Sequence, residues 1–133
     1  MSSLEIERSI DVEDAIREVL SDYMTSYVRP LPESLVVPSV EITAVGGKSE
    51  NKVDHFEVVL DSRAELEAEA LENLRNAIGI IIKIAKSQTT ALRFAEVNTL
   101  SSWGKDPVRP DLAMCSARLS VIAHIETVEV NKL

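Results

Sequence analysis

At 133 residues and 45% hydrophobic side chains, the chain has the size and apolar content of one domain with one core. Its formal net charge of -8 argues against a protein that wraps nucleic acid or adheres to an anionic membrane, because both need clustered lysine and arginine. Its one cysteine excludes an internal disulfide, and the sequence holds no signal-peptide core and no membrane-spanning apolar run. We therefore expect a single domain, residues 1–133, made in a reducing intracellular compartment.

The first part of the chain predicts a helix and then a β-hairpin. Asp11 is suited to cap the helix, and an apolar stripe at helical spacing runs from Val12 to Tyr23. The helix is expected to end near Tyr27, because two prolines follow and cannot continue it. Alternating apolar residues predict strands over residues 40–45 and about 53–60. Between these strands, residues 46–51 have turn chemistry and predict a polar, mobile loop.

A longer helix is expected next. Ser62 and Glu65 have the spacing of a capping box, which predicts a helix from there to about Ser87. Acidic residues fill its first half and basic residues its second, in the order that the helix dipole favours. Gly79 costs about 1 kcal/mol relative to alanine in a helix interior. It therefore predicts the close approach of a neighbouring segment.

The last third of the chain predicts two strands. The first covers about residues 91–100 and leads into a loop, residues 101–110, with the only tryptophan of the chain. The second, residues 112–130, alternates in side-chain type over a length that exceeds the usual 3–10 residues of a strand. We expect its proximal part, residues 115–121, to lie in the core sheet. Its distal part, residues 123–130, is expected to contact a neighbouring subunit.

The predicted elements follow the order α-β-β-α-β-β. Short connections between successive strands favour antiparallel pairing, and two amphipathic helices can cover one face of such a sheet. We therefore predict an α+β fold with a mostly antiparallel four-stranded sheet and two helices packed on one face.

None of the titratable residues forms a recognisable catalytic or metal-binding pattern. His55 and His124 lack suitably spaced ligand partners, and Cys115 lies on an apolar-leaning strand that favours burial over reactivity. The aspartates that could form an acid–base pair are Asp54, Asp61, Asp106 and Asp111, two of which border predicted elements, where capping and turn roles are ordinary. We predict no catalytic residue, no metal ligand and no cofactor, and therefore no enzyme.

Trp103 has two interpretations. It either folds back as a lid on the core or belongs to a contact loop, since tryptophan and arginine are enriched at the energetic centres of interfaces. On the second interpretation, a Trp103→Ala or Arg109→Glu chain folds but assembles less well. The interface candidates are charged or aromatic residues of the loops and the final strand: Trp103, Lys105, Arg109, Arg118, His124, Glu126 and Lys48.

The chain resembles the tail-terminator proteins of long-tailed bacteriophages, also described as tail-to-head joining or minor capsid proteins. The resemblance rests on chain length, on element order and on the stretch from Pro110 to Val121, where a turn after a Trp-containing loop feeds a long final strand. It implies a structural virion protein that forms a hexameric ring at the junction of tail and head. That ring would cap the tail-tube protein, end its polymerisation and meet a head-completion or connector protein, with DNA only passing through its lumen.

Two alternatives remain open. Another phage neck component, such as a head-completion or stopper protein, would share the ring but bind on the other side of the joint. A small intracellular α+β enzyme or ligand-binding domain would instead have convergent polar groups in a pocket. A cavity between sheet and helices that holds His55 or His124 beside carboxylates would favour that second alternative.

Overall fold

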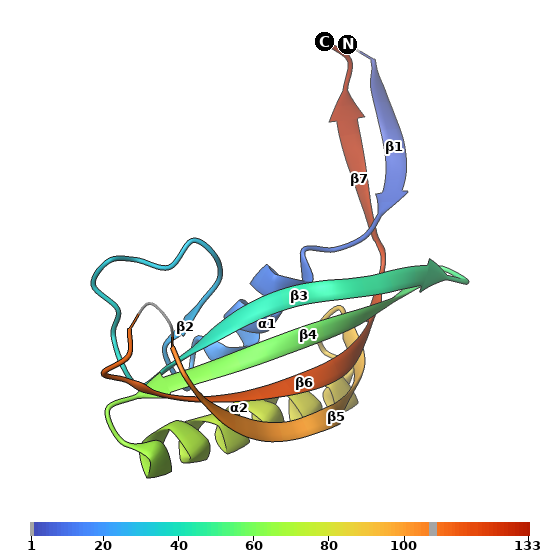
Figure 1. The fold of residues 1–133 in the computed structure, drawn as a ribbon. Helices are drawn as coiled ribbons and strands as arrows, with labels where there is room; N and C mark the ends of the chain where they lie inside the picture. The colour runs from blue at the N-terminus through green and yellow to red at the C-terminus, as the bar shows by residue number, and fades with distance from the viewer. Residues whose placement is uncertain (1, 107–108) are drawn as a thin grey trace.

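The computed structural model describes residues 2–106 and 109–133, with the backbone alone of residues 100–102 and 105. It confirms an α+β protein with two helices (Figure 1). The elements in chain order are β1 (Ser3–Arg8), α1 (Val12–Leu20), β2 (Ser26–Tyr27), β3 (Ser39–Glu50), β4 (Val53–Ala64), α2 (Glu67–Ser87), β5 (Leu92–Lys105), β6 (Ala113–His124) and β7 (Glu126–Asn131).

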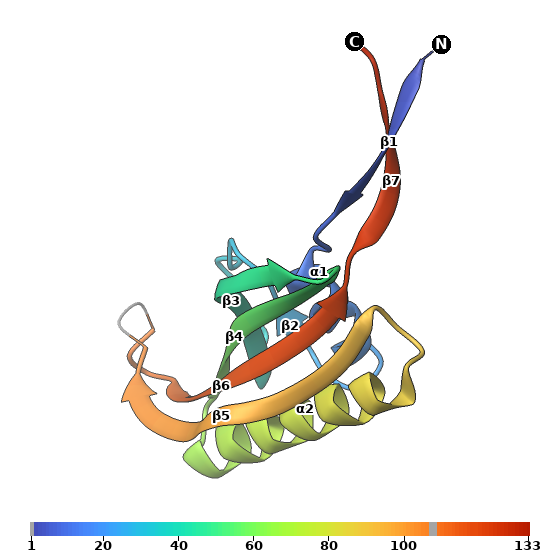
Figure 2. The same ribbon diagram turned by 90° about the vertical axis from the view of Figure 1, so that its right-hand side faces the viewer.

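The main sheet differs from the predicted four-stranded one. It has five strands in the order β2-β3-β4-β6-β5, and it is mixed, because β2 pairs with β3 in parallel. The pairs β3–β4, β4–β6 and β6–β5 are antiparallel. Both helices lie on one face of this sheet, as Figure 2 shows, with α2 packed across β4, β5 and β6 and α1 against β3.

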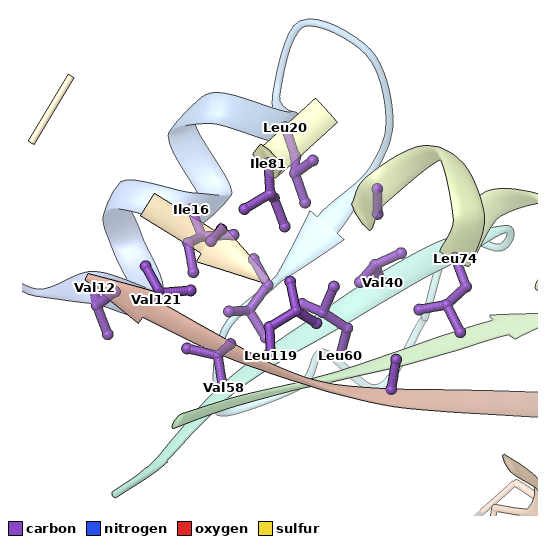
Figure 3. Close-up of a cluster of buried hydrophobic side chains, with 14 of the residues drawn as sticks. Val12, Ile16, Leu20, Val40, Val58, Leu60, Leu74, Ile81, Leu119 and Val121 are labelled. Atoms are coloured by element: carbon purple, nitrogen blue, oxygen red, sulfur yellow. The ribbon is translucent and has the colours of Figure 1, made fainter. Parts of the chain in front are cut away.

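The core lies between this face and the helices (Figure 3). Alternate residues of β6 point into it, because successive side chains of a strand face opposite sides. Each large apolar side chain buried there contributes about 1.5–3 kcal/mol to folding. The fully buried large residues are Ile16, Leu20, Val40, Ile42, Val58, Leu60, Leu74, Ile81, Leu92, Cys115, Leu119 and Val121.

The first helix begins as predicted and ends earlier. Its cap is confirmed, because the Asp11 carboxylate accepts a hydrogen bond from the Asp14 N–H at 3.1 Å. The helix ends at Leu20, whose carbonyl accepts from the backbone N–H of Tyr23 and Met24. The predicted end near Tyr27 is therefore wrong, and Tyr23 is 64% exposed instead of buried.

The predicted start of the long helix at Ser62 is also wrong. Strand β4 continues to Ala64, and the Ser62 hydroxyl donates to the Ala70 carbonyl at 2.7 Å instead of capping. The helix begins at Glu67, after Leu66, which makes no side-chain cap. Long-range pairing with β6 holds this segment extended, so tertiary contacts override the local capping motif. The predicted end at Ser87 is confirmed.

The predicted mobile loop 46–51 is mostly strand. Strand β3 runs through both glycines, with a register shift between Ala44 and Gly46. Only Asn51 and Lys52 form the turn, with φ of 52° and 64°. A Cβ on Gly47 would lie 2.2 Å from the His55 carbonyl oxygen, so this glycine allows the two strands to approach.

The final predicted strand is divided in two. Its proximal part lies in the core sheet as β6, which confirms the prediction for residues 115–121. Its distal part leaves that sheet after His124 and continues as β7, which pairs with the unpredicted N-terminal strand β1. Strand β5 extends to Lys105, so Trp103 lies in a strand and not in the predicted loop.

Candidate assembly interface

The β1–β7 ribbon stands apart from the rest of the molecule. Figures 1 and 2 show it projecting beyond the sheet, with both termini at its tip. Its two strands form a sheet of their own, and their extensive contacts are with each other. Isolated two-stranded ribbons are at best marginally stable in water. The ribbon therefore has little support from the rest of the described chain.

One face of the ribbon is apolar. Directly opposite residues of antiparallel strands share a face, and the register pairs Leu4 with Val130 and Ile6 with Val128. Leu4 is 65% exposed and Val130 is 46% exposed. These four side chains form an apolar strip, of which Ile6 and Val128 are partly buried and Leu4 and Val130 are exposed.

The opposite face of the ribbon is acidic. Glu5 and Glu129 lie directly opposite each other, and like charges in this relation are destabilising. Glu7 shares the face and lies 3.9 Å from Lys52 Nζ, at the outer limit of an ion pair. The ribbon therefore has an unbalanced negative charge as well as an uncovered apolar strip.

The sequence-predicted interface residues fall into two groups. Glu126 lies at the base of the ribbon, where its carboxylate accepts from Arg8 Nε at 2.9 Å, and His124 is exposed just before it. Lys48 is exposed near the tip of the β3–β4 hairpin and pairs with Glu50 at 3.2 Å. Arg118 lies on the sheet face away from the helices and pairs with Glu57 at 3.0 Å. These residues do not converge on one patch.

The remaining candidates lie at the other end of the sheet. Trp103 is 46% exposed near the end of β5, so it is not a closed lid on the core. Arg109 donates from Nη2 to the Pro32 carbonyl at 2.8 Å, which joins two loops instead of leaving the guanidinium free. The side chain of Lys105 lies outside the described residues.

A buried ion cluster lies near the Trp103 end of the sheet. Arg63 donates from Nε to Asp106 at 2.6 Å and from Nη1 to Glu41 at 2.9 Å, and all three residues are buried. Burial lowers the pKa of Arg63, but the hydrogen bonds and charges of Glu41 and Asp106 outweigh the effect of burial and leave this pKa raised. Because the pKa of Arg63 is raised in the folded state, the stability that its charge contributes is fully present below the ordinary pKa of arginine. It is lost only as the pH rises through the raised value. Arg63 therefore stays charged at neutral pH and ties Asp106, three residues after Trp103, to β4.

The groups considered for catalysis do not converge. Asp54 and His55 line the same 420 Å³ hollow near the β3–β4 hairpin. As neighbours on one strand, however, their side chains point to opposite faces. Cys115 is buried in the core, and the described residues contain no group of His, Cys, Asp or Glu arranged to hold a metal. The cavity between sheet and helices that would favour an enzyme is thus not formed by these residues.

A groove of about 620 Å³ lies between α2 and the segment that follows α1, at Tyr23 and Met24. Its apolar side includes Ile80 and Ile84, one turn apart, with the exposed ring of Tyr23 across from them. On the next row of α2, Arg75 and Lys83 are exposed and supply positive charge. The groove therefore combines an apolar wall with a basic one.

Gly79 lies between Arg75 and Lys83, one turn from each. A Cβ placed on it would have nothing within 4 Å, so no segment of the described chain approaches it. The predicted close approach of a neighbour is therefore wrong within this chain. The glycine leaves an unfilled notch on the surface of α2.

Sequence reasoning missed the ribbon and the groove for different reasons. The segment Ser3–Arg8 alternates Leu4 and Ile6 with glutamates, which is a period-two signal that could have indicated a strand. The groove has no such signal, because it combines α2 with a segment about fifty residues earlier.

Comparisons with known proteins identify no relative of this chain. The sequence matches no protein-family model, and it matches no curated protein. Among the described residues, no helix has the length and apolar character needed to cross a membrane.

Proposed function

We propose that the protein is a structural virion component that assembles into a ring, caps a phage tail tube and joins tail to head. The observation that carries the proposal is the projecting β1–β7 ribbon with its uncovered apolar strip. A partner surface that covers Leu4 and Val130 would supply the hydrophobic stabilisation that the ribbon lacks. This fits the self-association that the tail-terminator resemblance implies.

Ring closure follows from the geometry of such a contact. A ribbon at one place on a subunit that binds a different place on the next gives a head-to-tail interface, and that interface closes when the rotation between copies divides a full turn. We propose a hexamer, as the resemblance implies. The ring would end tail polymerisation because only one of its faces resembles a tail-tube ring.

The charge of the chain supports passage of DNA without adhesion. A net charge of -8 disfavours phosphate binding, so a ring of such subunits would let DNA move through its lumen. The tail-tube protein and a head-completion or connector protein are the proposed axial partners.

The direct test is assembly of the full chain, measured by multi-angle light scattering and negative-stain microscopy, alone and with the tail-tube protein encoded by the same genome. We expect rings, formed either in solution or on the tube end, and tubes that stop growing once capped. A chain that stays monomeric and leaves tube growth unchanged would refute the proposal. Binding to the head-side connector alone would instead indicate a stopper protein.

A further inference from the structure

We infer that the β1–β7 ribbon of one copy docks into the groove between α2 and the segment Tyr23–Met24 of a second copy. The inference rests on the proposed function, because it names the interface that would build the ring. Its occupant is a second copy of this chain, and three features of the described residues support that choice.

The first feature is complementary charge. The acidic face of the ribbon places Glu5 opposite Glu129, and among the described residues neither carboxylate forms an ion pair. The groove offers Arg75 and Lys83 on adjoining turns of α2. Arg75 pairs with Glu72 at 3.4 Å, and this pair is largely exposed and therefore weak. Both cations can thus turn toward the incoming glutamates.

The second feature is complementary apolar surface. The strip that contains Leu4 and Val130 is matched by the groove wall of Ile80, Ile84 and Tyr23. A ribbon with one apolar and one acidic face suits a groove with one apolar and one basic wall. Phe94, another exposed apolar residue, lines a smaller hollow of about 310 Å³.

The third feature is Gly79. A glycine in a helix interior costs stability, yet nothing in the described chain needs the space above it. An incoming strand edge would need it, because the backbone of the ribbon could approach α2 there more closely than any side chain permits. In the assembled protein, Gly79 would therefore permit a close backbone contact that the monomer does not make.

Charge reversal tests the pairing with full-length chains. One variant carries Glu5→Lys with Glu129→Lys, and the other carries Arg75→Glu with Lys83→Glu. Each variant alone is expected to self-associate at least about tenfold more weakly than the native chain, measured by light scattering and sedimentation. An equimolar mixture is expected to recover association, because the reversed ribbon fits the reversed groove and the native ribbon fits the native groove. Native association of both variants would overturn the inference.

Covalent capture keeps the test decisive if solution association is weak. A chain with Val130→Cys and Ile84→Cys is expected to give a ladder of cross-linked multimers under mild oxidation, while the native Cys115 stays buried. The matched control replaces Ile84→Cys by Val36→Cys, another exposed apolar position, and is expected to remain uncross-linked. Equal ladders in both chains, or none in either at high protein concentration, would overturn the inference.

Gly79→Leu separates folding from docking. Leucine favours the helix more than glycine, so the melting temperature should not fall, whereas the filled notch should weaken association at least about tenfold. Native association of this variant would overturn the groove placement. Rings that form regardless of all these changes would leave the proposed function standing, whereas a native chain that never assembles, with or without tube protein, would remove both.

Discussion

Arg63 shows how much one buried residue can carry in this fold. Its guanidinium binds two buried carboxylates, Glu41 and Asp106, from separate parts of the chain. Loss of the arginine would leave two acidic groups buried without it. This contrasts with Arg118, whose pair with Glu57 is about half exposed to solvent.

The expected effects of the two arginines on stability differ accordingly. Arg63→Ala should lower the free energy of unfolding by about 3–5 kcal/mol, because removing one member of a buried ion cluster is strongly destabilising. Arg29 remains paired with Glu41 at 3.3 Å in this variant. The matched change Arg118→Ala should cost less than about 1 kcal/mol, since solvent screens the exposed pair. Urea unfolding followed by circular dichroism measures both values. Similar losses in the two variants would contradict the assignment of the cluster as buried.

Some residue-level features were predictable from the sequence. The cap at Asp11 and the burial of Cys115 depend on local pattern, and both predictions are confirmed. The role of Ser62 was not predictable, because its hydroxyl bonds a carbonyl inside α2 that only the folded packing brings near. The cluster around Arg63 joins residues more than twenty positions apart, and spacing alone does not reveal it.

At the level of elements, the ribbon is the least supported part of the fold. Strands β3 to β6 share a core with two helices, whereas β1 and β7 have mainly each other. Local stability follows the density of buried contacts. The ribbon should therefore open far more often than the sheet.

Hydrogen exchange should reveal this difference. In the monomer, amides of β1 and β7 are expected to exchange at least about a hundredfold faster than those of β4 and β6, because few buried contacts hold them. On assembly, the ribbon amides should become protected while those of β6 change little. Mass spectrometry of exchanged peptides measures both states. A ribbon as protected as β6 in the monomer would contradict this account.

The strand pattern of the sequence indicated the elements better than their ends. Period-two alternation predicted β6 and much of β3 and β4, yet β3 and β5 each run farther than expected. Turn residues such as Gly46 and Gly47 read locally as a loop, but cross-strand pairing keeps them extended. The boundary between β6 and β7 at Ile125 likewise depends on tertiary pairing, because β6 lies in the main sheet whereas β7 pairs with β1.

On the scale of the whole molecule, the two ends of β6 lead to different candidate surfaces. The ribbon follows the end of β6, and Trp103 pairs with Cys115 near its start. Nine strand positions lead from Cys115 to His124 at the end of β6, which corresponds to roughly 30 Å. We expect the ribbon end to join subunits of the proposed ring and the Trp103 end to meet an axial partner.

Trp103→Ala tests this division. Since Trp103 lies far from the ribbon, the change should leave ring formation intact and weaken binding to the tail tube or head connector at least about tenfold. Phe94→Ala is the matched control, because Phe94 is equally exposed, at 46%, on the same strand. Co-sedimentation and light scattering give the two readouts. Unchanged axial binding in the Trp103 variant would remove this residue from the interface.

The sequence by itself determined the α+β class, the two helices, the core half of the final strand and the acidic charge, because these depend on local periodicity and composition. Only the tertiary structure decided the pairing of the two chain ends into a projecting ribbon and the groove beside α2. Both depend on contacts between distant segments, which no local pattern encodes. The unusual length of residues 112–130 thus belongs to two strands, one for the core and one that lies outside it.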